Sequence, residues 1–254
     1  MIQGSVLVID TATSRALAAL GDPGGGLLAS TAWTAGQRHS EELLPRVAGL
    51  LSEAGIDARQ LGALIVGTGP GAFTGLRVGL ATAKTLAHQL RLPIVGVSSA
   101  EALLLAARDG HAARDRQAAR DRQAAPASRL GPSPGAAPWD AAPGLVLVLP
   151  AGSTDRLLAR PGGPAELLPG GREPELGPGE AIVAVDLEGR ADPADSARGR
   201  AALDGLARAL LALGAARLAR GEVDDVERLV PEYVTLPRGV ASVAGEIAWS
   251  RDPR

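Results

Sequence analysis

The glycine-rich stretch between Val66 and Leu90 constrains the fold of this 254-residue chain more than any other segment. It leaves an apolar run, passes through Gly-Thr-Gly-Pro-Gly at 67–71, and continues as a helical pattern from about Thr74. A threonine hydroxyl at a helix start can accept hydrogen bonds from the free N–H groups of the first turn, so we expect Thr74 to cap this helix. The stretch therefore predicts a strand, a glycine turn and a helix, in that order.

Within the predicted helix, small residues and leucines form two adjoining rows with a period of about four. A glycine inside a helix costs about 1 kcal/mol relative to alanine, so it is tolerated where another helix or a ligand approaches the backbone closely. The small row is Gly75, Gly79, Ala83 and Ala87, and the leucine row is Leu76, Leu80 and Leu90.

The rest of residues 5–108 alternates strands with helices, which predicts an α/β lobe with a partly parallel sheet. Three strands joined by short turns come first, so they are expected to pair antiparallel. They cover residues 5–10, 15–20 and 27–33. The later elements are an amphipathic helix at 43–54, strands at 63–66 and 93–97, and a helix at 99–108. Because Pro45 lies early in the first helix, that helix is expected to begin late or bend there.

Residues 109–143 interrupt this alternation. A hexamer, Ala-Arg-Asp-Arg-Gln-Ala, occurs twice in tandem, and a stretch rich in proline, glycine and alanine follows. Such a composition offers little apolar surface, so we expect a disordered or loosely helical insert. Its arginines could touch RNA, but Asp115 and Asp121 interrupt them, which favours a solvated linker. We therefore expect an N-terminal lobe at 1–108, the insert at 109–143, and a smaller C-terminal lobe with a tail at 144–254.

The second lobe is expected to contain three strands and one long helix. The strands are predicted at 144–149, 155–160 and 181–186, and the helix at about 197–220. The segment at 230–237 is expected to be extended.

Composition excludes several classes of function. A formal net charge of −2 provides no global basic field that would attract nucleic acid or a membrane surface. The absence of cysteine excludes disulfides, thiol nucleophiles and zinc–thiolate sites. No basic region precedes the first apolar stretch, and no apolar run approaches the roughly 18 residues that a membrane span needs, so a cytoplasmic location is expected.

Common nucleotide and metal motifs are incomplete. Gly67-x-Gly69-x-x-Ala72 fits a loose dinucleotide pattern, but no Asp or Glu lies between residues 58 and 100 to hold a ribose. No lysine follows the glycines as a Walker loop requires. The three histidines are not spaced i, i+4, so no helical metal pair is predicted.

Asp10 is the best catalytic candidate. A carboxylate that ends a first strand before small hydroxylated residues is where sugar-kinase and actin-like folds place a metal–phosphate loop. The alternative is a strand-end aspartate that bonds its own turn. No second carboxylate in a comparable context completes a metal site, so no metal is predicted. The residues of a possible vestigial nucleotide loop are Asp10, Thr11, Thr13, Gly69 and Gly71.

Three motifs together resemble the bacterial TsaB (YeaZ) family, in order through residues 5–108. They are Ile9-Asp10-Thr11-Ala12-Thr13, Gln37-Arg38-His39-Ser40-Glu41-x-Leu43-Leu44-Pro45 and Gly69-Pro70-Gly71-Ala72-Phe73-Thr74-Gly75-Leu76-Arg77-Val78-Gly79. The resemblance implies an actin-like ATPase (ASKHA, ribonuclease H-like) fold with a reduced second lobe. The expected basic strand of the second lobe is replaced here by residues 151–156.

The resemblance also implies a role without catalysis by this chain. Such proteins partner TsaD, the catalytic subunit that attaches threonylcarbamoyl to the adenosine beside the anticodon of tRNAs reading codons that begin with A. TsaE, an ATPase, joins the pair, so ATP and Mg²⁺ are expected on the partners and tRNA contact is expected to be indirect. The alternative is an active kinase or hydrolase that uses Asp10 and the 67–71 loop around phosphate.

We expect the two N-terminal helices to pack side by side and to form a four-helix interface with TsaD, or with a second copy. The pattern does not show which of their residues face inward. A large side chain on the small row is expected to force the helices apart. The interface residues expected from the sequence are Leu43, Leu44, Val47, Leu50, Leu51, Gly75, Leu76, Gly79, Leu80, Ala83 and Ala87.

Overall fold

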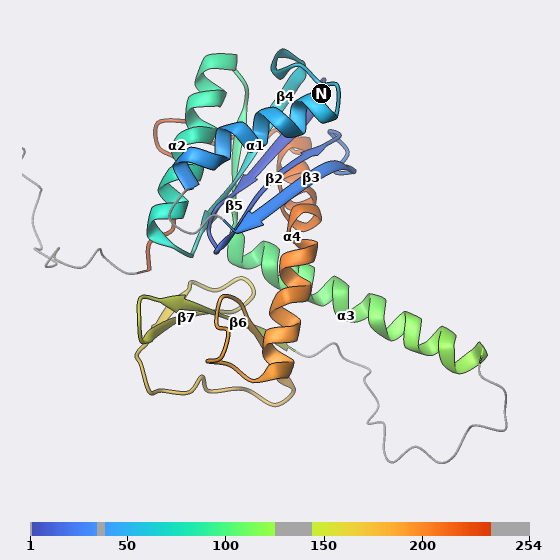
Figure 1. Ribbon diagram of the computed structural model, residues 1–254, viewed down its shortest axis with the longest axis vertical. Coiled ribbons are helices and arrows are strands. Elements are labelled where there is room, and N and C mark those ends of the chain that lie inside the picture. The colour runs from blue at the N-terminus through green and yellow to red at the C-terminus, as the bar shows by residue number, and fades with distance from the viewer. Residues whose placement is uncertain (1, 35–38, 125–143, 235–254) are drawn as a thin grey trace, which may run out of the picture.

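The computed structural model describes residues 2–34, 39–124 and 144–234, which form two lobes (Figure 1). Each lobe contains one mixed β-sheet with helices packed against it. The α/β fold class expected from the sequence is therefore confirmed. Within the described residues, none of the helices is both long enough and apolar enough to cross a bilayer.

The first lobe is built on a five-stranded sheet in the order β3-β2-β1-β4-β5. Strand β1 pairs antiparallel with β2, which follows it through a short turn, and parallel with β4, which follows the crossover helix α1. Strand β5 pairs parallel with β4. The bounds are β1 Ser5–Asp10, β2 Arg15–Gly21, β3 Leu27–Thr34, β4 Leu61–Gly69 and β5 Ile94–Ser98.

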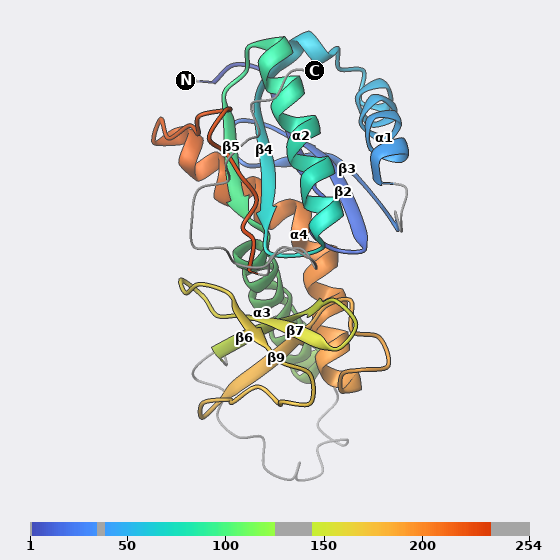
Figure 2. The same cartoon turned by 90° about the vertical axis from the view of Figure 1, so that its left-hand side faces the viewer.

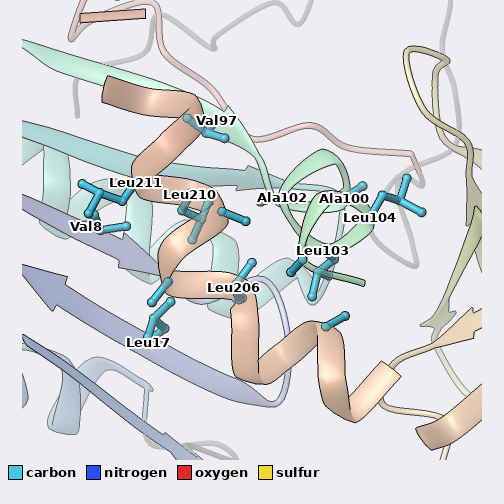
Figure 3. Packing of buried hydrophobic residues seen from close by; sticks show 14 of the residues in the cluster. Val8, Leu17, Val97, Ala100, Ala102, Leu103, Leu104, Leu206, Leu210 and Leu211 are labelled. Atoms are coloured by element: carbon cyan, nitrogen blue, oxygen red, sulfur yellow. The ribbon is translucent and has the colours of Figure 1, made fainter. Parts of the chain in front are cut away.

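Helices cover both faces of this sheet because its strands are apolar on both sides. Leu7 and Ile9 of β1 pack on the side of α1 (His39–Glu53) and α2 (Phe73–Leu90). Val6 and Val8 pack on the opposite side, against α4 (Pro193–Ala219) and α3 (Ser99–Ala124). Figure 3 shows Leu206, Leu210 and Leu211 of α4 in that second layer. The first core therefore lies in two layers separated by the sheet.

The second lobe holds a four-stranded sheet in the order β8-β7-β6-β9. Its strands are β6 Gly144–Ala151, β7 Asp155–Ala159, β8 Glu166–Leu168 and β9 Glu180–Ala184. Strand β8 lies in a second segment rich in proline and glycine, residues 161–179 between β7 and β9, and no sequence pattern predicted it. Helix α4 packs against β9 at one end and against the first sheet at the other, so one helix joins the two lobes (Figures 1 and 2).

Three expectations about the helices need correction. Helix α3 does not end at residue 108 but continues through the tandem repeat to Ala124, while residues 125–143 lie outside the described part of the chain. Thr74 does not cap α2, because the helix begins at Phe73 and Ala72 is its N-cap, without a side-chain hydrogen bond. Helix α1 does not begin late, because it starts at His39 and contains Pro45.

Close packing of α4 on the second sheet depends on Gly199. A Cβ atom at this position would lie 1.7 Å from the carbonyl oxygen of Ala184, which is backbone and cannot rotate away. We therefore expect Gly199→Ala to lower the free energy of unfolding by about 1–3 kcal/mol, as for overpacking elsewhere, despite the better helix propensity of alanine. Chemical denaturation measures this change.

Gly49→Ala in α1 is the matched control for Gly199→Ala. A Cβ atom at Gly49 has no neighbour within 4 Å, so this variant should gain up to about 1 kcal/mol. If both glycine variants change the stability equally, the close approach at Gly199 does not determine the packing of α4.

Candidate functional site

The carboxylate of Asp10 is buried where β1 ends and is already hydrogen bonded within the chain. The backbone N–H of Ala12 donates to Oδ1 at 3.0 Å, and the Ser99 hydroxyl donates to Oδ2 at 2.5 Å. Burial raises the pKa of Asp10, although these two hydrogen bonds act in the opposite direction. Both oxygens of the best catalytic candidate therefore have partners from the protein itself.

The glycine loop after β4 packs directly on the turn that follows Asp10. A Cβ atom at Gly67 would lie 1.8 Å from Oδ2 of Asp10, and one at Gly71 would lie 2.1 Å from the carbonyl oxygen of Ala12. The N–H of Ala72 donates to the same Ala12 carbonyl at 2.7 Å. Glycine is required here because backbone meets backbone or a buried carboxylate, which removes the space that a ligand would need.

The two threonines of the predicted nucleotide loop also bond to the protein. The Thr11 hydroxyl donates to the carbonyl of Gly75 at 2.7 Å, and the Thr13 hydroxyl donates to the carbonyl of Arg15 at 3.0 Å. A Cβ atom at Gly79 would lie 2.1 Å from Oγ1 of Thr11. The first half of the small row on α2 therefore accommodates the end of β1.

A carboxylate from the second lobe occupies the remaining donors of this turn. The N–H and the hydroxyl of Ser14 each donate to Asp186 at 2.6 Å. A backbone N–H beside a hydroxyl is the type of donor set that holds phosphate in nucleotide-binding loops. In this protein that donor set binds an internal anion from the segment after β9, so the two lobes are joined at the turn.

Sequence reasoning found Asp10 but missed Ser99 and Asp186. Ser99 was expected only as the start of a helix, and Asp186 only as the end of a strand. Both lie far from Asp10 in sequence, so local spacing could not connect them. Within the described part of the chain, no group of three or more His, Asp or Glu residues could hold a metal ion.

Most residues expected at the partner interface face the core of their own lobe. The buried ones are Leu43, Val47, Leu50, Gly75, Leu76, Gly79, Leu80, Ala83 and Ala87. Leu51 is half-buried, and Leu44 alone of the expected residues is exposed, at 51%. The small row therefore allows α2 to approach its own sheet, so a large side chain at Ala83 would strain the core of the lobe rather than separate two subunits.

The opposite side of α2 faces away from the sheet and is exposed, and Arg77 on it contacts the segment after α4. Its exposed residues recur at helical spacing and define what we call the outer face, together with Leu44 of the adjacent helix α1. The α2 residues of the outer face are Thr74, Arg77, Ala81, Thr85 and His88. Helices α1 and α2 contact each other and lie on the same side of the sheet, as expected (Figure 2).

Comparison with known sequences matches the first lobe. The profile of the family described as TsaD, tRNA N6-adenosine threonylcarbamoyltransferase, matches residues 29–116. An uncharacterised protein of Mycobacterium leprae is 42% identical over 101 residues, which cover 39% of this chain and 28% of that protein. The Escherichia coli tRNA threonylcarbamoyladenosine biosynthesis protein TsaB is 36% identical over 94 residues, which cover 37% of this chain and 40% of TsaB. The matched region thus spans less than half of each relative.

Comparison with solved structures extends over both lobes. The structure of YeaZ from Pseudomonas aeruginosa superimposes with a TM-score of 0.62 and covers 91% of this chain and 99% of YeaZ. Sequence identity in that superposition is 24%, so the likeness establishes a shared fold. The family-profile match at residues 29–116 therefore includes α1 and α2, whereas the structural likeness extends over both lobes.

The buried carboxyl of Asp10 makes the stability of the protein depend on pH. Because burial raises the pKa of Asp10 above the ordinary 3.8, its carboxyl group stays protonated to a higher pH in the folded protein than in the unfolded chain. The contribution to stability is greatest below pH 3.8 and decreases as the pH rises through the raised pKa. We therefore expect the stability difference between the parent and Asp10→Asn to shift in favour of the variant across this window, as measured by denaturation at a series of pH values.

Ser99→Ala provides a second check on the titration of Asp10. It removes a hydrogen bond that lowers the pKa, so the pH window should move upward. A difference between the parent and Asp10→Asn that does not vary with pH would show that Asp10 is ionised in the folded protein as readily as in the unfolded chain.

Proposed function

We propose that this chain, which local sequence similarity and fold both support as a member of the TsaB (YeaZ) family, is a non-catalytic subunit of a tRNA threonylcarbamoyltransferase complex. In this role it is needed for threonylcarbamoylation of the adenosine beside the anticodon in tRNAs that read codons beginning with A. Its partners are TsaD, which carries out catalysis, and the ATPase TsaE. The complex works in the cytoplasm.

The non-catalytic part of this proposal rests on one observation: the polar groups of the loop after β1 are already bonded to other groups of the protein. Asp10 bonds to Ser99 and Ala12, and the Ser14 donors bond to Asp186. A phosphate and its Mg²⁺ would have to displace both sets of contacts and would also meet the carboxylate of Asp186. ATP and Mg²⁺ are therefore assigned to the partner subunits, and this chain requires no cofactor.

The alternative is an active nucleotide-dependent kinase or hydrolase that uses Asp10 and the 67–71 loop. Such an enzyme needs an ionised carboxylate that can reach a metal ion, together with space beside the glycines for phosphate. The desolvated Asp10 and the close contact of Gly71 with Ala12 provide neither condition. The geometry therefore supports the scaffold role over the enzyme.

Binding to TsaD is assigned to the outer face of α1 and α2. The inward sides of these helices bury apolar residues on their own sheet, which leaves the outer face available for a second pair of helices. Homodimerisation through the same face would compete with TsaD. Contact with tRNA is then made through the complex rather than by this chain alone.

The purified chain is expected neither to hydrolyse ATP nor to modify tRNA. Addition of the chain to TsaD, TsaE, tRNA and threonylcarbamoyl-adenylate should be required for modification of the tRNA, measured by mass spectrometry of its nucleosides. Asp10→Asn should support modification as the parent does, because Asp10 has no catalytic role. ATP turnover by the purified parent that disappears in Asp10→Ala would instead establish the kinase or hydrolase alternative.

Charge placed on the outer face should weaken the complex with TsaD. Ala81→Glu and Leu44→Glu each put a carboxylate where an apolar or small side chain would be buried, so we expect at least about tenfold lower affinity. Sedimentation velocity measures the affinity, and circular dichroism confirms the fold.

The control for the charge variants is Ala216→Glu. It makes the same change on an exposed position of α4, which packs on the opposite side of the sheet, and should leave the affinity within about twofold. Equal affinities for the parent, Ala81→Glu and Leu44→Glu would place the TsaD contact elsewhere.

A further inference from the structure

The chain contains one phenylalanine and one tyrosine, and they meet on the surface around a single arginine. The ring centroids of Phe73 and Tyr233 lie 5.1 Å apart. The guanidinium carbon of Arg77 lies 3.9 Å from the centroid of Phe73, and Nε of Arg77 donates to the Tyr233 hydroxyl at 3.1 Å. Tyr233 remains 42% exposed. Phe73 is half-buried, and a partly exposed tyrosine of this kind is enriched at protein interfaces.

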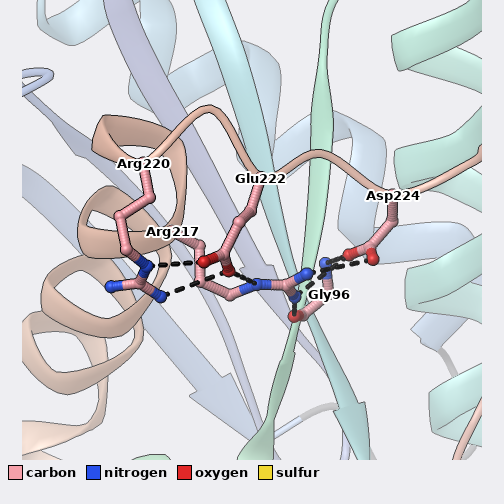
Figure 4. Close-up of polar contacts among 5 residues, drawn as sticks. All are labelled: Gly96, Arg217, Arg220, Glu222 and Asp224. Atoms are coloured by element: carbon pink, nitrogen blue, oxygen red, sulfur yellow. Dashed lines mark hydrogen bonds and ion pairs between the residues drawn. The ribbon is translucent and has the colours of Figure 1, made fainter.

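The segment that follows α4 carries Tyr233 to this position and is held along its length. Asp224 accepts from Arg217 and from the N–H of Gly96 in β5, and Figure 4 shows this network. Lys84 of α2 donates to the carbonyl of Leu229 at 3.1 Å, and the N–H of Glu232 donates to the carbonyl of Thr68 at 2.7 Å. Tyr233 is therefore presented to solvent by a fixed backbone.

Arg77 is oriented by its ring contacts but still has donors to offer. Its Nε bonds to Tyr233, while no described residue accepts a hydrogen bond from either Nη. A guanidinium edge that is fixed in this way matches the two oxygens of a carboxylate. Tyrosine and arginine are also the residues that most often dominate binding energy at protein interfaces.

The charge around Arg77 favours an acidic protein over RNA. Helix α2 carries no Asp or Glu, and the sequence contains none from residue 58 to 100. The ammonium of Lys84 is already bonded to carbonyls, and Arg77 and Arg91 are separated by about 21 Å along the helix axis. Two free cations give at most two phosphate contacts, whereas useful affinity for RNA takes several. One carboxylate needs only one guanidinium.

We propose that Phe73, Arg77 and Tyr233 form an anchor site for a partner protein that presents a carboxylate to the two Nη atoms of Arg77 and apolar surface to the two rings. The site adjoins the outer face, because Arg77 belongs to both. The inference rests on the proposed function, which supplies TsaD as the partner. It adds the segment after α4 to an interface otherwise made only by α1 and α2.

The test compares Arg77→Ala, Arg77→Lys and Arg91→Lys for binding to TsaD from the same organism, and separately to its unmodified tRNA. Arg77→Ala should weaken TsaD binding about 10- to 30-fold. Arg77→Lys should recover only part of the loss, because lysine keeps the positive charge but lacks the paired N–H donors of the guanidinium. Tyr233→Phe, which keeps the ring and loses the hydrogen bond to Arg77, should weaken binding less than Arg77→Ala does. Arg91→Lys should bind as the parent does.

The outcomes separate the anchor site from the proposed function. If the parent binds TsaD and folded Arg77→Ala binds it equally well, the anchor site is refuted and the proposed function stands. If the parent does not bind TsaD, the proposed function fails, and the anchor site fails with it. A loss that affects tRNA affinity but not TsaD affinity would assign the cluster to RNA and overturn the inference.

Discussion

The close packing of helix α4 on both sheets is the constraint on which the rest of the structure depends. Near one end of the helix, Gly199 touches the backbone at Ala184 of β9. Towards the other end, Gly214 packs on the side chain of Ile65 in β4. A residue larger than glycine at either contact would move the helix away from its sheet. Helix α4, together with α3, which also contacts strands of both sheets, therefore holds together two lobes that have separate sheets and separate strand orders.

With the lobes held together by α4, polar groups at the boundary between the lobes form hydrogen bonds and ion pairs across that boundary. Ser14 donates to Asp186, and the next residue, Arg15, forms an ion pair with Asp204 of α4 at 2.7 Å. Ser14 lies in the turn after β1, and Arg15 begins β2. The same turn packs against the loop at Gly71, so residues from three parts of the chain close the place where a ligand would bind. Internal groups therefore bond to the polar groups of this turn and fill the space beside its glycines.

Because the protein's own groups fill the loop after β1, binding of a partner is expected on the surface of the first lobe rather than in a cavity. Helices α1 and α2 bury one side on the sheet, and the segment after α4 lies against β5 and α2. The outer face and the Phe73–Arg77–Tyr233 cluster therefore form one continuous region, which they share at Arg77 in the N-terminal half of α2. A region with a fixed backbone and partly exposed rings loses little conformational entropy on binding, which favours a stable complex with another protein.

The sequence by itself determined the order of the strands and helices except β8, and it carried the resemblance to a known family. Strand β1 was predicted with its observed bounds because an apolar run ends there in a carboxylate, and the Gly69–Gly79 motif is the most specific part of the resemblance to the TsaB (YeaZ) family. These features are local, so spacing along the chain was sufficient. The helix was predicted to end at 108 and residues 109–143 to be disordered or loosely helical, because composition rather than periodicity decided that prediction; α3 in fact continues to Ala124.

Only the tertiary structure decided which side of each helix faces inward and which residues meet. The rows at Ala83 and Leu76 looked equally suitable for a partner and for a core, and burial against the sheet settled the choice. The contacts of Asp10 with Ser99 and of Ser14 with Asp186 join residues 89 and 172 positions apart. Tyr233 meets Arg77 across 156 positions. No periodicity connects positions so far apart, because their proximity is fixed by strand pairing and by the packing of α4.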